Sequence, residues 1–274
     1  PSSAASDVYK RQGVHRQVRP AEYMEFLDCN VHYGVPAQHT PLMPVPTVDA
    51  LRKEMQRAGV SGAVVRRDEV YWEGVGIGNR MVAQDIAPYD ELFGLWAILP
   101  PHTHEVPEPE DMLGEMKRHK IVGWFCWPEL HRYVFRDFAM GEWFRLAEEH
   151  RVPIFLGQGS GVSLAELADV LEKHPELRVV WLGQGVWPDD RYIRPFLKEF
   201  PGFHLDLSRY MADGGLEELV EEYGPERLLY GSGFYDMYFG GGMLMIRHAQ
   251  IPEGAKELIA GGNLRRLMEE VVYD

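Results

Sequence analysis

Phe26-Leu27-Asp28-Cys29-Asn30-Val31-His32-Tyr33-Gly34 is a short apolar stretch that ends in polar residues and a glycine. An apolar run of this length, bounded by polar residues and Gly, indicates a buried strand whose carboxyl end opens into a loop. Side chains alternate along a strand, so Asn30 and His32 lie on the same face. The stretch therefore predicts a strand end at which two polar side chains project together into a cavity.

From Phe26 onward, segments with the character of strands and helices alternate along the chain. Several strand candidates are almost continuously apolar, which is typical of parallel strands that are covered on both faces. The predicted strands are residues 26–30, 62–66, 92–99, 121–127, 152–156, 179–182, 204–207 and 227–230. The predicted helices are residues 48–58, 77–86, 108–120, 141–150, 164–173, 190–200, 216–223 and 255–271. This alternation predicts one α/β domain over residues 20–274, a single (β/α)8 TIM barrel, with an open doubly wound sheet as the alternative.

Three further sequences follow one another near the end of the chain: Gly215-Leu216-Glu217-Glu218-Leu219-Val220, Gly224-Pro225-Glu226-Arg227-Leu228-Leu229-Tyr230-Gly231-Ser232-Gly233-Phe234 and Gly261-Gly262-Asn263-Leu264-Arg265-Arg266-Leu267. In order and spacing they resemble the seventh helix, eighth strand and closing helix of the amidohydrolase-related (amidohydrolase 2) family of TIM-barrel metal-dependent hydrolases. The stretch around Asn30 is similar to that family's first strand, Asp-x-His-x-His, with Asn30 at the first histidine position. The resemblance covers roughly Phe26 to Met268. It implies a site where the carboxyl ends of the strands meet the following loops.

The resemblance also implies where the family's metal ligands would fall. These positions are Asn30, His32, Gly157, Gly183 and Gly233. Only His32 among them is a residue type that commonly binds a metal, whereas zinc and its relatives need three or four N, O or S ligands. We therefore expect a divergent subgroup with a degenerate site and no tightly bound divalent metal.

The fifth and sixth predicted strands both end in Gly-Gln-Gly, and this sequence allows two interpretations. A shift of one residue would place Gln158 and Gln184 at the metal positions, where their amides would line a pocket together with bare backbone. Alternatively, both sequences are tight glycine turns that follow a strand.

The third predicted strand is followed by Pro100-Pro101-His102-Thr103-His104-Glu105, which resembles a loop motif in a subgroup of the family that also lacks the metal residues. In an extended segment, residues two apart project to the same side. His102 and His104 therefore have three possible roles: they bind a metal with His32, act as acid and base, or hold the loop. We predict that His32, His102 and His104 are catalytic and that this loop closes over the mouth of the barrel.

Other polar residues follow the remaining strands. Arg66 and Arg67 end the second strand, where one of them can face a carboxylate or phosphate while the other lies at the surface. Asp206 and Ser208 alternate along the seventh strand, so they share a face, and Asp206 is a further predicted catalytic residue. The residues predicted to bind substrate are Asn30, Arg66, Gln158, Gln184, Tyr235 and Asp236.

Five more polar residues are expected at the same rim or at the surface. Glu129 and His131 follow the fourth strand and complete the rim. His119, His150 and His174 lie near the ends of predicted helices, where a solvated histidine complements the helix dipole.

Several motifs of other enzyme classes are absent from the sequence, namely the Gly-x-Ser-x-Gly elbow, the phosphate-binding loop, the Cys-x-x-Cys pair and His-Glu-x-x-His. Gly76-Ile77-Gly78-Asn79 has the wrong spacing for a dinucleotide loop and is expected to cap a helix. Gly240-Gly241-Gly242 either brings backbone amides toward an anion or forms a flexible connection.

Composition limits the partners of the chain. Its 274 residues are 45% hydrophobic and carry a formal net charge of -14, which argues against a nucleic-acid or anionic-membrane surface. No apolar run is long enough to span a bilayer. The two cysteines, Cys29 and Cys126, lie in predicted strands, so we interpret them as buried thiols of a cytoplasmic protein. The oligomeric state stays open between a monomer and a homo-oligomer.

The first residues are set apart from the predicted domain. Asp7-Val8-Tyr9-Lys10-Arg11-Gln12 resembles the translation of a transposon adapter used in sequencing libraries, as expected of read-through in a metagenomic assembly. Residues 1–19 are therefore predicted to be a non-native or disordered leader.

Two classes of function remain open. The first is a hydrolase of a small lactone, ester or carboxylate that has dispensed with the metal, since activated esters and lactones need less carbonyl polarisation than amides. The second is a non-catalytic barrel that binds a small ligand or a protein partner in the same cavity. The convergence of His32, His102 and Asp206 on one reacting atom would favour the enzyme.

Overall fold

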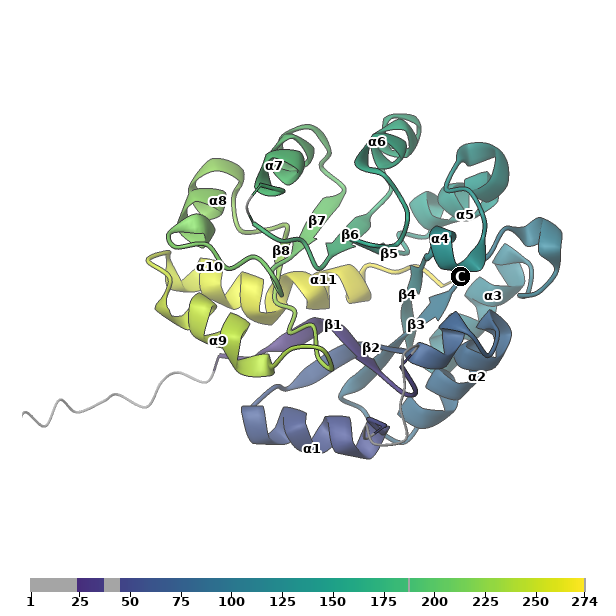
Figure 1. Ribbon diagram of the computed structural model, residues 1–274, viewed down its shortest axis with the longest axis horizontal. Helices are drawn as coiled ribbons and strands as arrows, with labels where there is room; N and C mark the ends of the chain where they lie inside the picture. Colours follow the sequence, from purple (N-terminus) through teal and green to yellow (C-terminus); the bar gives the residue numbers. More distant parts are fainter. Residues whose placement is uncertain (1–23, 37–44, 187, 274) are drawn as a thin grey trace, which may run out of the picture.

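The computed structural model describes residues 24–36, 45–186 and 188–273, so the predicted leader at 1–19 lies outside the described residues. Eight parallel strands lie side by side in the order of the chain (Figure 1). They are β1 (Leu27–Tyr33), β2 (Gly62–Arg67), β3 (Leu92–Ala97), β4 (Ile121–Phe125), β5 (Ile154–Gly157), β6 (Val179–Leu182), β7 (Phe203–Asp206) and β8 (Leu228–Leu229). This sequential order is that of a barrel and differs from the order of a doubly wound sheet.

The segment that includes and follows β8 closes the sheet against β1. The backbone N–H of Cys29 donates to the carbonyl of Tyr230 at 3.0 Å, and that of His32 donates to Phe234 at 2.8 Å. In the other direction, the N–H of Gly233 donates to the carbonyl of Asn30 at 3.0 Å. The (β/α)8 TIM barrel is thus confirmed, and the open-sheet alternative is wrong.

Helices surround the strands on the outside of the barrel (Figure 1). They are α1 (Val48–Ala58), α2 (Val75–Ile86), α3 (Pro109–Met116), α4 (Pro128–His131), α5 (Asp137–Glu149), α6 (Leu164–Lys173), α7 (Asp190–Glu199), α8 (Gly215–Tyr223), α9 (Phe239–His248), α10 (Glu253–Glu257) and α11 (Asn263–Glu269). Short turns of helix are η1 (Asp68–Tyr71), η2 (Pro101–Thr103), η3 (Lys117–His119) and the π-helical η4 (Leu258–Gly262), which joins α10 to α11.

The helix ends follow from local sequence. Before α6, the Ser163 hydroxyl accepts from the backbone N–H of Glu166, and the Glu166 carboxylate accepts from the N–H of Ser163, a capping box that satisfies two otherwise unpaired donors. After α1, Gly59 ends the helix at a φ of 79°, a left-handed conformation that glycine adopts without a Cβ clash. The buried face of α6, Leu167, Val170 and Leu171, packs on the sheet at helical spacing.

Two predictions about glycine-rich stretches need correction. Gly240-Gly241-Gly242 lies inside α9, because Phe239, Met243 and Ile246 give that segment a buried face at helical spacing. It is therefore neither an anion-binding loop nor a flexible connection. Gly76–Asn79 does not precede its helix, since α2 begins at Val75, and a Cβ on Gly78 would come within 2.5 Å of the Val70 side chain.

His174 is also placed differently from its prediction. It is buried at the end of α6, where its Nδ1 lies 2.7 Å from Glu148 Oε2 and its Nε2 lies 3.0 Å from Asp137 Oδ1. Two carboxylates on α5 thus hold the imidazole that was expected to be solvated. His174 joins α5 to α6 and plays no part in the strand-end cavity.

Cys29 and Cys126 are buried free thiols, as predicted. In the part of the chain that the structure describes, no helix has the length and apolar character needed to cross a membrane.

Candidate functional site

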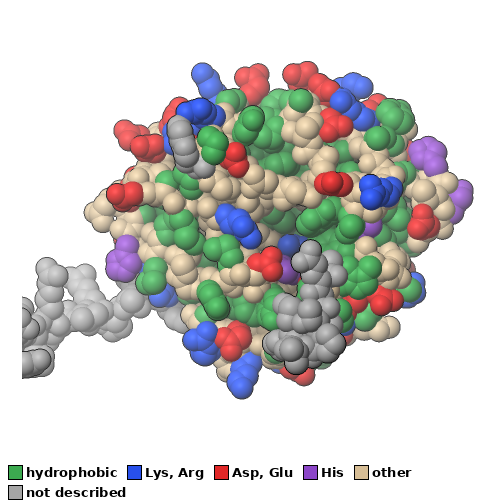
Figure 2. Space-filling model, viewed as in Figure 1, with side chains coloured by type: hydrophobic (Ala, Val, Ile, Leu, Met, Phe, Trp, Pro, Cys, Tyr) green, Lys and Arg blue, Asp and Glu red, His purple; other side chains and the backbone are tan. Residues whose placement is uncertain are grey.

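A cavity of about 250 Å³ lies at the carboxyl ends of the strands. Its lining comes from seven strands or the loops that follow them: Asn30, His32, Arg66, Phe125, Trp127, Gly157, Gln158, Leu182, Gly183, Arg209, Gly233 and Asp236. All five positions that the family resemblance assigned to metal ligands are in this lining, as predicted. Acidic, basic and histidine side chains gather near the middle of the face shown in Figure 2.

His32, in the lining of the cavity, is hydrogen-bonded to the buried Asp68. His32 Nδ1 lies 2.9 Å and 3.0 Å from the two carboxylate oxygens of Asp68, which begins η1 directly after β2. The Asp68 side chain is 4% exposed and that of His32 is 14% exposed. A carboxylate accepts, so it fixes the proton on Nδ1 and leaves the Nε2 lone pair of the neutral imidazole free. Nε2 lies 3.8 Å from Oδ2 of the exposed Asp236.

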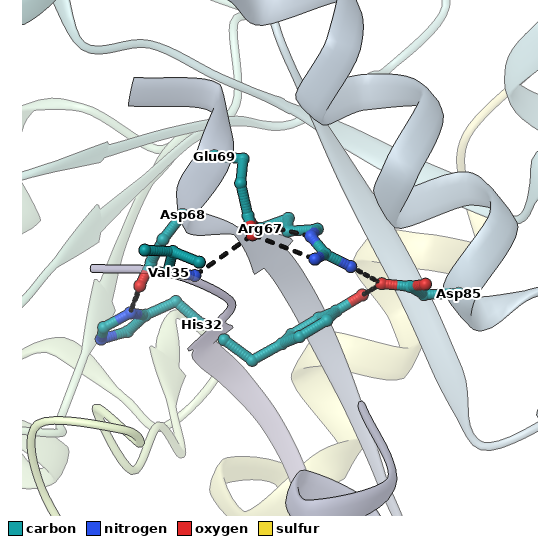
Figure 3. A network of polar contacts seen from close by, with 7 residues as sticks. His32, Val35, Arg67, Asp68, Glu69 and Asp85 are labelled. Atoms are coloured by element: carbon teal, nitrogen blue, oxygen red, sulfur yellow. Dashed lines mark hydrogen bonds and ion pairs between the residues drawn. The ribbon is translucent and has the colours of Figure 1, made fainter. Parts of the chain in front are cut away.

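A second polar network joins η1 to α2 through Arg67 (Figure 3). Arg67 Nε donates to Glu69 Oε2 at 2.8 Å, and Arg67 also pairs with Asp85 on α2. The Tyr33 hydroxyl donates to the same Asp85 at 3.0 Å. Figure 3 shows His32 and Asp68 on one side of this network and Arg67 reaching the other way to Asp85. Of the two arginines that end β2, only Arg66 lines the cavity, and Arg67 is partly buried in its ion pairs and not at the surface as expected.

The floor of the cavity is a hydrogen-bonded relay through Asn30. Its Nδ2 donates to Asp206 Oδ2 at 2.8 Å and to Ser208 Oγ at 3.3 Å. Its Oδ1 accepts from Arg66 Nη1 at 3.0 Å. Both polar atoms of the Asn30 amide, which was predicted to bind substrate, are therefore hydrogen-bonded to the protein. Its effect on a ligand is indirect.

Asp206 lies beneath the cavity, where it is fully buried. It accepts from the Ser208 hydroxyl at 2.6 Å and from the Gly183 N–H at 2.9 Å. Burial raises its pKa above the ordinary value, while these hydrogen bonds act in the opposite direction. A Cβ on Gly231 would come within 2.1 Å of Asp206 Oδ1, so this position requires glycine for the carboxylate to fit.

Asp28 is a second buried carboxyl below the floor. Its Oδ1 accepts from the backbone N–H groups of Asn30 and Ser232, both at 3.0 Å. Its Oδ2 has no hydrogen-bond partner among the described residues. Burial raises the pKa of Asp28 to about 7, with a smaller contribution in the same direction from Asp206.

Arg66 is held at three points along the wall. Besides its bond to Asn30, its Nε donates to the Tyr71 hydroxyl at 3.2 Å, and its Cζ lies 5.2 Å from the centroid of the Phe125 ring. Such contacts fix a planar guanidinium without neutralising it.

The remaining predicted site residues divide into two groups. Gln158 and Asp236 line the cavity, and Gln158 Nε2 donates to Asp189 at 2.7 Å. Gln184 is turned away from it, because its Oε1 accepts from Trp181 Nε1 at 2.8 Å and its side chain is buried. Tyr235 follows β8 without contributing to the lining, and its ring centroid lies 5.7 Å from that of Phe234.

The structure does not bring the histidines of the loop after β3 to the cavity. His102 lies on η2 and faces a separate hollow formed with the start of α5, including Asp137 and Arg145. His104 is 77% exposed, with its Nδ1 3.3 Å from Glu108 Oε1. His32, His102 and Asp206 therefore do not converge on one reacting atom, and this particular support for the enzyme over the ligand-binding barrel is not found. Of the other rim candidates, His131 Nε2 donates to the Val70 carbonyl at 2.8 Å, and His131 is not part of this lining.

Sequence reasoning missed several residues of the cavity and its supports: Asp68, Tyr71, Phe125, Trp127 and Arg209. For Asp68 a signal existed, because it is a carboxylate that directly follows a predicted strand, at the edge where barrel sites lie. Arg209 carried the same signal, since it lies two residues beyond the predicted strand 204–207.

Residues 27–268 match the family model described as Amidohydrolase (Amidohydro_2). This chain belongs to that amidohydrolase family. No curated protein sequence matches the chain. Among solved structures it is similar to 5-carboxyvanillate decarboxylase from Sphingomonas paucimobilis, with 14% identity and a TM-score of 0.68 over 90% of this chain and 99% of the other.

Two further structures extend the comparison of the amidohydrolase chain. A probable 2-pyrone-4,6-dicarboxylic acid hydrolase from Acinetobacter baumannii, with citric acid bound, is 15% identical, with a TM-score of 0.65 over 90% of this chain and all of the other (100%). A dihydroxybenzoic acid decarboxylase from Polaromonas sp., with bound manganese and an inhibitor, is 14% identical, with a TM-score of 0.66 over 89% and 97%. At these identities the likeness shows the fold alone.

Metal binding in this family raises the question of whether the present residues fit a divalent ion. Within residues 24–36, 45–186 and 188–273, no three His, Cys, Asp or Glu side chains are grouped so that they could hold one. The Arg66 guanidinium also occupies the Oδ1 side of Asn30, where its positive charge opposes a second cation. The described residues at this site therefore do not fit a divalent metal.

Proposed function

We propose that this amidohydrolase-family protein hydrolyses a small lactone or ester that carries a carboxylate, without a divalent metal. The observation that carries the proposal is the His32–Asp68 pair, because His32 lines the strand-end cavity and Asp68 holds its Nδ1 but not its Nε2. A carboxylate-held imidazole with one free nitrogen is the arrangement that removes a proton from water.

The cavity suits a small, flat, anionic substrate. Its volume of about 250 Å³ is slightly below the lower end of ordinary ligand pockets, which hold drug-sized molecules in about 300–1,000 Å³. Phe125 and Trp127 supply aromatic walls, and Arg66 and Arg209 supply two positive charges. The solved relatives named above are, by their descriptions, decarboxylases and a hydrolase of small ring-shaped acids, which supports the same substrate class.

The hydrolysis step assigns one role to each member of the pair. His32 Nε2 takes a proton from a water molecule as that water attacks the ester carbonyl. Asp68 keeps the imidazole in the correct tautomer and stabilises the imidazolium that forms. Loss of His32 removes the base, whereas loss of Asp68 leaves an imidazole that is no longer held in the correct tautomer.

The test is a hydrolysis screen with the full chain, using 2-pyrone-4,6-dicarboxylate and small lactones and esters with and without a carboxylate. Acid release is followed with a pH indicator after the protein has been treated with EDTA. We expect turnover that EDTA does not change and that His32→Ala lowers by about 10²-fold or more. His248→Ala is the matched control, because His248 is an exposed histidine in the last turn of α9.

Three results would contradict the proposal. Turnover that falls after EDTA and returns with manganese would show that a metal takes part. Equal rates for His32→Ala and the parent would place the base elsewhere. Saturable ligand binding with no hydrolysis of any compound would favour the non-catalytic, ligand-binding alternative.

A further inference from the structure

Arg66 lies at the wall of a cavity and has no anionic partner in the part of the chain that the structure describes. Its hydrogen bonds go to the Tyr71 hydroxyl and to Asn30 Oδ1, which are both neutral. Among the described residues it makes no ion pair, in contrast to Arg67, which meets both Glu69 and Asp85. A partly buried charge without a counter-ion favours binding of an anion at its free N–H groups.

The orientation of Asn30 explains why Arg66 is held in this way. The Asp206 carboxylate accepts four hydrogen bonds, one each from Asn30 Nδ2, the Gly183 N–H, the Ser208 N–H and the Ser208 hydroxyl. An acceptor on this side forces the amide nitrogen of Asn30 toward Asp206 and its oxygen toward Arg66. The relay therefore runs from the buried Asp206 through Asn30 to Nη1 of Arg66.

The relay uses Nη1 and Nε and leaves Nη2 of Arg66 without a hydrogen-bond partner among the described residues. His32 and Arg66 are also paired across β1 and β2 in register, so both side chains lie on the same part of the cavity wall. A carbonyl carbon attacked by a water on His32 Nε2 would thus have the guanidinium beside its oxygen.

We propose that Arg66, positioned by Asn30 and Asp206, is the oxyanion-binding catalytic residue of this site. This inference rests on the proposed hydrolysis. It adds the positively charged group that stabilises the oxyanion, for which the His32–Asp68 pair has no counterpart. Arg66 supplies the positive charge that a divalent metal supplies in a metal-containing site, and Asn30 stands at a position that the family resemblance assigns to a metal ligand. Asn30 and Asp206 act through Arg66 and are positioning residues.

The step balances with water as the only co-reactant. The water oxygen forms a bond to the carbonyl carbon, its proton passes to His32 Nε2, and the carbonyl π pair moves to the oxygen that faces Arg66. The C–O bond to the alkoxide then breaks as the oxyanion pair returns, and His32 gives its proton to the leaving oxygen. A lactone gives a single hydroxy acid, and an ester gives a separate alcohol and acid.

The test combines truncation with chemical rescue, using the best substrate from the hydrolysis screen. We expect Arg66→Ala to lower kcat by about 10²- to 10³-fold with little change in KM, because an oxyanion is bound only in the transition state. Guanidinium chloride should restore at least about a tenth of the lost rate, whereas sodium chloride at equal ionic strength should not. Arg57→Ala is the matched control, since Arg57 is an exposed arginine paired with Glu54 on α1.

Asn30→Ala tests the relay separately. It should lower kcat by about 10- to 100-fold and leave the KM little changed, because Arg66 is then misplaced but present. A readout that needs no turnover is the side-chain ¹⁵N–¹H spectrum of Arg66. Its guanidinium signals should be resolved in the parent and averaged by rotation in Asn30→Ala.

The outcomes separate this inference from the proposed function. A parent that hydrolyses substrates while Arg66→Ala changes only KM, or shows no rescue, would overturn the oxyanion role and leave the His32 mechanism standing. A parent with no hydrolysis would overturn the proposed function and, with it, the catalytic role of Arg66. Identical Arg66 spectra in the parent and Asn30→Ala would overturn the positioning relay in either case.

Discussion

His32 and His174 are both histidines held by carboxylates, and they differ in what remains free. Both nitrogens of His174 face carboxylates, Glu148 at 2.7 Å and Asp137 at 3.0 Å, in a joint between two outer helices. In His32 only Nδ1 faces a buried carboxylate, and the residue lines a cavity. A histidine satisfied on both sides contributes to stability, whereas one with a free nitrogen beside a cavity is available for chemistry.

The largest expected effect that tests this contrast comes from Asp68→Asn. The amide keeps the size of the carboxylate but removes its charge, so it no longer fixes the Nδ1–H tautomer or stabilises the imidazolium. We expect kcat for the best substrate to fall by about 10²- to 10³-fold while the unfolding midpoint in urea shifts little. Asp236→Asn should cause a smaller loss, because Asp236 lies 3.8 Å from His32 and is 65% exposed. Equal losses in the two variants would contradict the special role of Asp68.

His174→Ala should have the opposite profile. It removes the donor to a mostly buried Glu148 and to a half-exposed Asp137, whose pKa lies below the ordinary value chiefly because His174 donates to it. We expect a loss of about 2 kcal/mol in the free energy of unfolding, after allowance for the exposure of Asp137. Activity per folded molecule should match the parent. Urea unfolding and a hydrolysis assay check both parts, with His248→Ala as the control, and a fall in kcat without a loss of stability would reverse the comparison.

The barrel itself was predictable because apolar strands and amphipathic helices carry their period in the local sequence. The strand over Val179–Leu182 and the helices over Val48–Ala58 and Leu164–Lys173 have the predicted bounds. The helix α9 was missed because its glycines made the buried positions hard to recognise in the sequence. The strand β1 runs to Tyr33 because its polar end is paired with β2. Strand ends therefore depend on partners that the local sequence does not reveal.

The site was less predictable, because its contacts join residues that are distant in the chain. Asp68 reaches His32 only because β1 and β2 pair with His32 opposite Arg66, a register that sequence alone does not fix. Gln158 and Gln184 have the same Gly-Gln-Gly context, yet Gly183 has a φ of 71° and Gln184 then turns back onto Trp181. In the same way, nothing local indicated that Asn30 would bond inward to Asp206.

Asp28 extends the comparison of His32 with His174 to a buried carboxyl that, among the described residues, has no hydrogen bond to a histidine. Burial raises its pKa to about 7, above the value of about 3.9 in an unfolded chain. From about pH 4 to about pH 7 the unfolded state releases this proton while the folded state keeps it, so stability falls as pH rises through this range and levels off above it. We expect Asp28→Asn to flatten this dependence in part, since the raised pKa of Asp206 acts in the same direction. Urea unfolding at several pH values measures the slope, and an unchanged slope would exclude Asp28 as its source.

His102→Ala has the smallest expected effect and tests a third situation, a histidine near a strand end but outside the cavity. His102 faces the start of α5 rather than the lining that contains His32. Its nitrogens are therefore placed to meet neither the substrate nor the attacking water, and we expect kcat and KM to stay within about twofold of the parent, far from the roughly 10²-fold expected for a lost general base. The measurement is steady-state hydrolysis of the best substrate by His102→Ala and His104→Ala side by side. A loss of tenfold or more in either variant would mean that the loop after β3 moves over the mouth of the barrel during turnover. The chemistry would then belong to two regions of the molecule and not to the His32 side alone.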